Sequence, residues 1–432
     1  MGQAAMGRKR AVLVGINYPG TDRELKGCLN DVTRMRRCLV DRFGFDGADV
    51  RVLADADPAT PPPTGANIRR ELERLVGDAR PGDTLFFHYS GHGLQLPAET
   101  GEDDDTGYDE CIVPCDGNLI KEYHSTKGPN LPGFDSSTVL SVRPRFQGTG
   151  CKGLFTIVSD SCHSAGLIDK AKEQIGNSTR QNKTQHPDHQ ETRPPPPGAS
   201  LLGIVHGVFE SLSIHLLRRG SQQSSHSQSN GAELDTKAEA TTTHASVKSR
   251  SLPLPAFIEM LREHTGEGGD VGVGTIRATL FRHFGDDASP KVKRFAQAMG
   301  GKLRQEQDGD EMEGNGGGQV ETLSRALGRE EVCSVKEVYA GTAAGAPLPC
   351  NGVLISGCQT DETSGDATTA EGVSYGLLSN AIQTILAGRK HGAVTNRELV
   401  LRARELLSKQ GVITQQPGLY CSDEHASAPF IC

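Results

Sequence analysis

The chain has 432 residues, of which 35% are hydrophobic, and it carries a net charge of −8 with a pI near 6.0. This acidic balance argues against a general nucleic-acid binder, which would present a basic face. No run reaches the roughly 20 apolar residues that cross a bilayer, and residues 1–10 have no apolar signal-peptide core. The eleven cysteines show neither disulfide-scaffold nor zinc-ligand spacing. We therefore expect a cytoplasmic protein with reduced thiols, access to the nucleus, and no nucleic-acid or membrane partner.

The N-terminal part of the chain alternates between strand and helix patterns. Short apolar runs bounded by turn residues predict buried strands at residues 11–16, 50–53, 84–89 and 154–158. Apolar residues three and four apart predict helices at residues 29–43 and, after a cap at Thr64, at 68–76. Such alternation indicates an α/β fold with a mostly parallel central sheet and helices on both faces.

A histidine and a cysteine each follow the end of one of these strands. His92 lies in Ser-Gly-His-Gly after the strand at 84–89, and Cys162 lies in Ser-Asp-Ser-Cys-His after the strand at 154–158. Sites in open α/β sheets form beyond the carboxyl ends of the strands. A single cysteine there is more often a packed core thiol, but a nearby base can hold it as a thiolate. We therefore predict Cys162 as nucleophile and His92 as general base, and a helix expected at 164–174 would lower the thiol pKa.

The middle of the chain has a different composition. Residues 181–250 are rich in Gln, Ser, Thr, His and Pro and cannot bury enough apolar area to offset ordering entropy. Regular structure is expected again as helices at 252–264, from 289, at 373–386 and at 395–408, with a strand at 352–356. We therefore divide the chain into a large catalytic segment (8–180, with an atypical insert at about 121–150), a partly disordered linker with helical pieces (181–330) and a small catalytic segment (331–432).

Several blocks resemble the metacaspases, and most closely their plant-type (type II) branch. The His block is Tyr89-Ser90-Gly91-His92-Gly93, and the Cys block is SDSCHS at residues 159–164. Further blocks are LKGCLND at 25–31, GEDDDTGYDEC at 101–111, SGCQT at 356–360 and PGLYC at 417–421. The resemblance implies a caspase-type sandwich fold and a monomeric cysteine endopeptidase that cleaves proteins after Arg or Lys. It also implies a role in programmed cell death.

The resemblance also implies which residues recognise the substrate. Asp31, Ser90 and Asp160 match the specificity pocket, with Asp361 as a weaker candidate. Carboxylates next to the nucleophile attract a guanidinium or ammonium group and repel an acidic residue. The backbone N–H groups of Gly93 and Cys162 are expected to hold the oxyanion.

Regulation is implied by the same resemblance. Metacaspases are commonly activated by Ca²⁺, and Asp109 and Asp169 match two of the carboxylates that hold the ion. Hard cations take six to eight oxygen ligands, so two carboxylates alone do not complete a site. Self-cleavage at a basic linker residue is also expected, with Lys237, Lys248 and Arg250 as exposed candidates.

The segment after Ile120 departs from the family pattern. Residues 121–150 replace an acidic Asp-Asp-Asp and a helix, and Asp135 is at most a partial substitute for those Ca²⁺ ligands. His92 and Cys162 are 70 residues apart, against about 50 in caspase-type enzymes. Ala165 also stands where relatives usually carry Gly.

Two readings of the function stay open. The first is a working endopeptidase with altered Ca²⁺ control, and the second is a catalytically impaired relative that acts as a binding partner or decoy. A zinc or redox protein is disfavoured, because Cys28, Cys38, Cys111 and Cys115 lack paired ligand spacing.

Overall fold

In the computed structural model, residues from both ends of the chain contribute to one central sheet. The structure describes residues 7–77, 79–80, 82–97, 108–121, 154–164, 167, 173–176, 244–266, 271–290, 292–293, 295–296, 352–359, 362–389 and 393–431. Asp169, Lys237 and Asp361, together with Asp135, Ala165 and almost all of the segment 121–150, lie outside these ranges. No helix within the described ranges is both long and apolar enough to cross a membrane.

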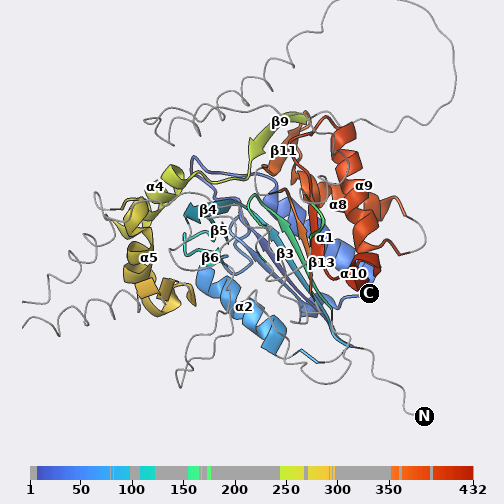
Figure 1. The fold of residues 1–432 in the computed structure, drawn as a ribbon, viewed down its shortest axis with the longest axis horizontal. Coiled ribbons are helices and arrows are strands. Elements are labelled where there is room, and N and C mark those ends of the chain that lie inside the picture. The colour runs from blue at the N-terminus through green and yellow to red at the C-terminus, as the bar shows by residue number, and fades with distance from the viewer. Residues whose placement is uncertain are drawn as a thin grey trace, which may run out of the picture. The chain divides into compact units, whose positions relative to one another are not determined.

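The central sheet has seven strands (Figure 1). In spatial order its strands are β2 (Val50–Ala54), β1 (Lys9–Gly15), β3 (Thr84–Ser90), β7 (Leu154–Asp160), β10 (Gly352–Ser356), β13 (Gly418–Cys421) and β8 (Glu173–Ile175). The first five strands run parallel, whereas β13 is antiparallel to both of its neighbours. Because β10 pairs with β7, the large and small catalytic segments share one sheet. The predicted mostly parallel α/β architecture is confirmed.

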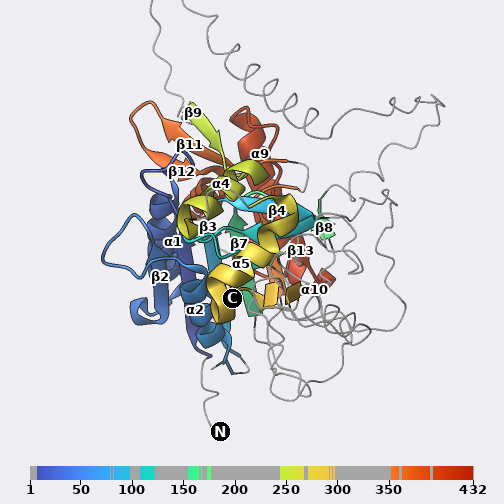
Figure 2. The same ribbon diagram turned by 90° about the vertical axis from the view of Figure 1, so that its left-hand side faces the viewer.

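Helices cover both faces of this sheet (Figures 1 and 2). One face carries α2 (Gly65–Gly77), α4 (Leu254–Thr265) and α5 (Ile276–Phe284); the other carries α1 (Cys28–Phe43), α8 (Leu377–Ala387), α9 (Asn396–Lys409) and α10 (Asp423–Ser427). Short 3-10 turns lie at Gly47–Asp49, Val273–Thr275 and Gly285–Asp287. Each layer encloses its own hydrophobic core, as expected for a sheet that is buried on both sides.

Local signals explain the limits of the principal helices. In α1, Val32, Met35 and Leu39 recur at helical spacing and are buried against the sheet, and Gly44 ends the helix at φ 69°. A left-handed residue at this position favours glycine, which has no Cβ to clash. Helix α9 begins where the Thr395 side chain accepts the N–H of Glu398 at 3.1 Å, as the sequence predicted.

Two three-stranded sheets flank the central one. The first has the order β12 (Ser374–Gly376), β11 (Gly365–Thr369) and β9 (His244–Ser249), and the second has the order β4 (Gly93–Pro97), β5 (Tyr108–Ile112) and β6 (Ile120–Lys121). Both lie next to the end of β3. Strand β4 starts directly after His92, and β9 leads into Arg250, whose carbonyl oxygen accepts the N–H of Gly93 in β4.

Three expectations about secondary structure are wrong. A helix is predicted at 164–174, but its last two residues belong to strand β8 (Glu173–Ile175), because β8 pairs with β13 at the outer edge of the sheet. Residues 374–376 form β12 where a helix was expected, so α8 begins only at Leu377. Residues 244–249 at the end of the low-complexity segment form β9, because pairing with β11 supplies backbone hydrogen bonds that composition does not reveal.

Candidate active site

Strands β3 and β7 are parallel neighbours whose ends lie side by side. Their register pairs Ser90 with Asp160, so His92 and Cys162 each follow two residues beyond the same end of the sheet. The two loops are in contact: a Cβ on Gly93 would lie 1.7 Å from the carbonyl oxygen of Cys162. Only glycine fits there, and the structure brings the His and Cys blocks together.

His92 is almost completely buried and is oriented by backbone and aromatic contacts. Its Nε2 donates to the carbonyl oxygen of Arg23 at 2.8 Å, which leaves Nδ1 without a proton. Nδ1 is buried and has no hydrogen-bond partner among the described residues. The Tyr18 ring lies 4.8 Å from the imidazole, and the Tyr18 hydroxyl accepts the His92 N–H. Burial lowers the pKa of His92 to about 4, so at neutral pH the imidazole can accept a proton.

Cys162 is fully buried beside the loop that follows β10. Its Sγ accepts the backbone N–H of Ser364 at 2.9 Å. The thiol of Cys358 lies next to it, and this neighbour together with burial raises the pKa of Cys358. The two cysteines differ in position, because Cys162 follows β7, the neighbour of β3, and its backbone lies against Gly93 next to His92.

The side chain of Arg250 fills a buried pocket beside this pair. Its Nη1 donates to Ser90 Oγ and to the Asp160 carbonyl, both at 2.8 Å, and its Nη2 donates to Asp31 Oδ2 at 2.9 Å. Nη2 also donates to Asp366 Oδ1 at 2.9 Å, and the Asp160 carboxylate lies 3.5 Å from Nη1. The guanidinium is 0% exposed, so the expectation that Arg250 is an exposed residue is wrong. We call Asp31, Ser90, Asp160 and Asp366 the acidic pocket.

Backbone bonds hold the acidic pocket in place. Asp31 accepts the Gly376 N–H, Asp160 accepts the Ser379 N–H at 2.6 Å, and Asp366 accepts the Gly27 N–H at 3.0 Å. Three carboxylates surround one guanidinium, and the burial of Asp31 raises its pKa to about 6 even though Arg250 opposes the shift. The pocket therefore keeps surplus negative charge with Arg250 in place.

The backbone of Arg250 lies against the reactive loops as a bound substrate would. Its carbonyl oxygen accepts the Gly93 N–H at 2.9 Å, and its N–H donates to the Ser364 carbonyl at 2.9 Å. On the following residue, Ser251 Oγ lies 3.0 Å from His163 Nε2. The peptide bond between Arg250 and Ser251 thus lies between the Gly93 N–H and the Ser251 side chain that contacts His163.

The residues before Arg250 extend this arrangement as a strand. β9 pairs antiparallel with β11, with Ser249 opposite Gly365 and Lys248 opposite Asp366. The Nζ of Lys248 donates to the carbonyl oxygens of Asp22 and Glu24, at 3.0 and 2.8 Å. Lys248 therefore lies outside the acidic pocket, two residues from the residue that fills it.

Two important contributors have no motif in the sequence. Asp366 lies in β11, far along the chain from Asp160, and the backbone carbonyl of Arg23 orients His92. Aspartate is depleted in strands, so an Asp between Gly365 and Ala367 in a strand-like run is a usable signal. The Arg23 carbonyl has no side-chain signal at all.

Asp109 is the one predicted calcium ligand within the described ranges. It is buried, and its Oδ2 accepts Arg277 Nη2 of helix α5 at 3.0 Å. The described residues contain no cluster of three or more His, Cys, Asp or Glu side chains that could hold a metal. Among the described residues, Asp109 supplies one carboxylate of the six to eight oxygen ligands that Ca²⁺ takes, and the Arg277 guanidinium supplies the positive charge beside it.

A buried thiol and a neutral imidazole at adjacent strand ends, within a sheet covered on both faces, define a cysteine peptidase of the caspase-like class. Comparison with known proteins agrees. The family model described as "Metacaspase, peptidase C14 domain" matches residues 9–171.

Three Arabidopsis thaliana proteins match nearly the whole chain: Metacaspase-4 at 47% identity, Metacaspase-7 at 45% and Metacaspase-6 at 44%. Each alignment covers 98% of this chain and 100% of the relative. The chain belongs to the metacaspase family.

Proposed function

We propose that this protein is an endopeptidase that cleaves after Arg or Lys and processes itself at the bond between Arg250 and Ser251. The observation that carries the proposal is Arg250 in the acidic pocket, with its carbonyl on the Gly93 N–H. A guanidinium held by several carboxylates is a strong, directional interaction, whereas an acidic residue in the same place would be repelled.

The proposed mechanism uses groups that lie at the neighbouring ends of β3 and β7. The Cys162 proton passes to Nδ1 of His92, which the Arg23 carbonyl fixes in the required tautomer. The thiolate attacks the Arg250 carbonyl carbon, and the Gly93 N–H stabilises the resulting oxyanion. The protonated His92 then gives its proton to the Ser251 amine as the C–N bond breaks. Water finally hydrolyses the thioester at Arg250.

Specificity is tested with four fluorogenic peptides that differ only in their last residue: Arg, Lys, Leu or Asp. We expect hydrolysis of the Arg and Lys peptides and at least about 100-fold less for Leu and Asp, since each lost charged hydrogen bond costs about 1.5–3 kcal/mol. Equal rates for Leu and Arg would contradict the proposal.

Gly376→Ala provides a structural check on the same pocket. A Cβ at Gly376 would lie 2.3 Å from Asp160 Oδ2 and 2.4 Å from the Nη1 of Arg250, so it would exclude the guanidinium. We expect a loss of about 100-fold in kcat/KM for the Arg peptide. Gly376 immediately precedes helix α8, and the matched control is Gly388→Ala, immediately after the same helix. There the new Cβ meets nothing closer than 3.5 Å.

The pH profile should report the charge of Asp31. Its pKa is raised to about 6, whereas that of His92 is lowered to about 4. As the pH falls through 6, Asp31 gains a proton and loses its attraction for the substrate guanidinium. We therefore expect KM for the Arg peptide to rise there while kcat stays level until His92 protonates.

Separate measurement of kcat and KM between about pH 4.5 and 8 distinguishes the titration of Asp31 from that of His92. In Asp31→Asn the KM should be raised at every pH, and its pH-dependent rise should be lost. A kcat that falls with an unchanged KM near pH 6 would contradict the assignment.

Ca²⁺ activation is part of the proposal on the strength of the family resemblance and of Asp109. If the ion uses Asp109, it must compete with Arg277, whose Nη2 lies 3.0 Å from the carboxylate. We expect calorimetric titration of Cys162→Ala protein to detect Ca²⁺ binding. Adding Arg277→Gln should tighten it by about tenfold, a gain of about 1.4 kcal/mol, and Asp109→Asn should weaken it. Identical isotherms for all three proteins would exclude Asp109 as a ligand.

A further inference from the structure

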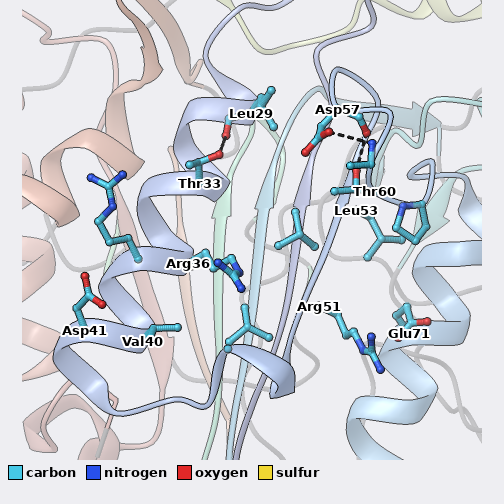
Figure 3. A pocket seen from close by; sticks show the side chains of 16 residues that line it. Leu29, Thr33, Arg36, Val40, Asp41, Arg51, Leu53, Asp57, Thr60 and Glu71 are labelled. Carbon is cyan, nitrogen blue, oxygen red and sulfur yellow. Dashed lines mark hydrogen bonds between the residues drawn. The ribbon is translucent and has the colours of Figure 1, made fainter.

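An open groove of about 750 Å³ lies along β2, the edge strand of the central sheet (Figure 3). Helix α1 forms one wall with Leu29 and Val40, and Glu71 of α2 with the turn at residues 57–61 forms the other. The floor is β2 itself, through Val52 and Leu53. Strands β1 and β3 separate β2 from β7, which carries the Cys162 loop, so the groove is distinct from the active site.

The groove exposes backbone groups of β2. The Thr60 hydroxyl accepts the Ala54 N–H at 3.1 Å and donates to the Ala54 carbonyl at 3.0 Å, so both groups point away from β1. Backbone groups of alternate residues in a strand point to the same side, and the N–H and C=O of Val52 therefore point into the groove. Thr60 closes one end of this edge, and the remaining length fits a short extended peptide.

The charges around the groove favour an acidic occupant. Arg36 and Arg37 of α1 and Arg51 of β2 line it, and no ion pair or hydrogen bond among the described residues involves these three side chains. Figure 3 shows Arg36 between α1 and the strands, and Arg51 on the α2 side. Two of the three carboxylates that line the groove are engaged locally: Asp57 accepts the Ala59 N–H, and Glu71 accepts Arg74. Since only Glu71 is paired with a cation in the part of the chain that the structure describes, the three arginines face two carboxylates, Asp41 and Asp57, and the unpaired side-chain charge is positive by one.

We propose that this groove binds an extended acidic segment of a partner protein, which adds to the sheet as a strand beside β2. The backbone groups of Val52 would supply the main-chain hydrogen bonds, and Arg36 and Arg51 would bind carboxylates on the two faces of the added strand. A second copy of this chain is a poorer occupant, because pairing β2 with itself would bring Arg51 close to its own counterpart.

The test uses full-length Cys162→Ala protein and the labelled peptide Val-Glu-Glu-Glu-Val, whose neighbouring Glu side chains lie on both faces of a strand, read by fluorescence anisotropy. We expect this acidic peptide to bind and the peptide Val-Lys-Lys-Lys-Val not to bind. Arg36→Glu with Arg51→Glu should weaken binding by more than about tenfold. Arg70→Glu on the solvent side of α2 reverses one charge outside the groove and should leave binding unchanged.

Val52→Pro tests the backbone contact, since proline removes the exposed N–H. We expect it to weaken peptide binding, with circular dichroism used to check that the variant is folded; the arginine variants decide the matter if it is not. No binding of the acidic peptide, or equal losses in the Arg70→Glu control, would overturn the proposal. A concentration-dependent dimer that the acidic peptide does not displace would identify the second copy as the occupant and would also overturn it.

Discussion

Cys162→Ala protein should lose hydrolysis of Arg peptides by at least about four orders of magnitude, as other peptidases do without their nucleophile. It should also remain uncut between Arg250 and Ser251, whatever its concentration or incubation time. The cause is the loss of the sulfur atom that accepts the Ser364 N–H, on a residue whose backbone lies against Gly93 of the His92 loop. Rates from the fluorogenic assay and intact-mass spectrometry of the chain measure the two effects.

Cys358→Ala is the matched control for this experiment. Its thiol is also buried and adjoins Cys162, but it follows β10, which β7 separates from β3 and its His92 loop. We expect this variant to keep its activity. Activity that survived in Cys162→Ala would contradict the assignment of Cys162 as the nucleophile. Well-folded wild-type protein without activity would favour the alternative of an impaired relative that acts by binding.

Arg250→Gln should abolish cleavage at the bond before Ser251 while leaving hydrolysis of an added Arg peptide intact. Glutamine lacks the charge that Asp31, Asp160 and Asp366 bind, so residue 250 no longer occupies the acidic pocket in an extended conformation. The added peptide then meets an empty pocket. Mass spectrometry of the fragments, together with N-terminal sequencing for a chain that starts at Ser251, reports the result.

Two further variants separate position 250 from its neighbours. Arg250→Lys keeps a positive charge and should still be cut, though more slowly, because an ammonium cannot make the paired bonds of a guanidinium. Lys248→Gln removes only the contacts to the Asp22 and Glu24 carbonyls and should leave the cut at Ser251 in place. Continued cleavage before Ser251 in Arg250→Gln would contradict the self-processing site.

The removal of Arg250 has a second expected effect, on the pocket itself. Breaking a buried ion pair by deleting one partner typically costs about 3–5 kcal/mol, because a charge is left buried without compensation. Here protonation of the carboxylates offsets part of this cost. Asp31 already has a raised pKa while Arg250 is present, so it takes up a proton readily. Thermal unfolding of Arg250→Gln should therefore be more sensitive to high pH than that of the wild type.

The fold was predictable where pattern and burial agree. Strands β1, β3 and β7 have uninterrupted apolar runs because helices cover both of their faces, and the placement of His92 and Cys162 follows from parallel neighbours ending at one edge. Asp31, Ser90 and Asp160 were named from the family blocks, and the structure brings all three to Arg250.

The features that the sequence did not predict depend on contacts between distant parts of the chain. β9 has no apolar period and orders only by pairing with β11, which also delivers Asp366 to the acidic pocket. The choice of Arg250 over Lys248 as the buried residue is likewise a matter of register: Lys248 pairs with Asp366 across the two strands, and Arg250 lies two residues beyond it.

The pairing of β9 with β11 has a consequence for what a single cut achieves. Breaking the bond after Arg250 leaves that residue at the end of a strand still joined to β11, and Leu252, Phe257 and Leu261 on the other side of the break are still buried in the core. The new carboxyl end is a tethered product, and a short tether gives an effective concentration in the millimolar range. A substrate in the micromolar range therefore competes poorly until that strand detaches, so the severed chain and the active enzyme are two different states.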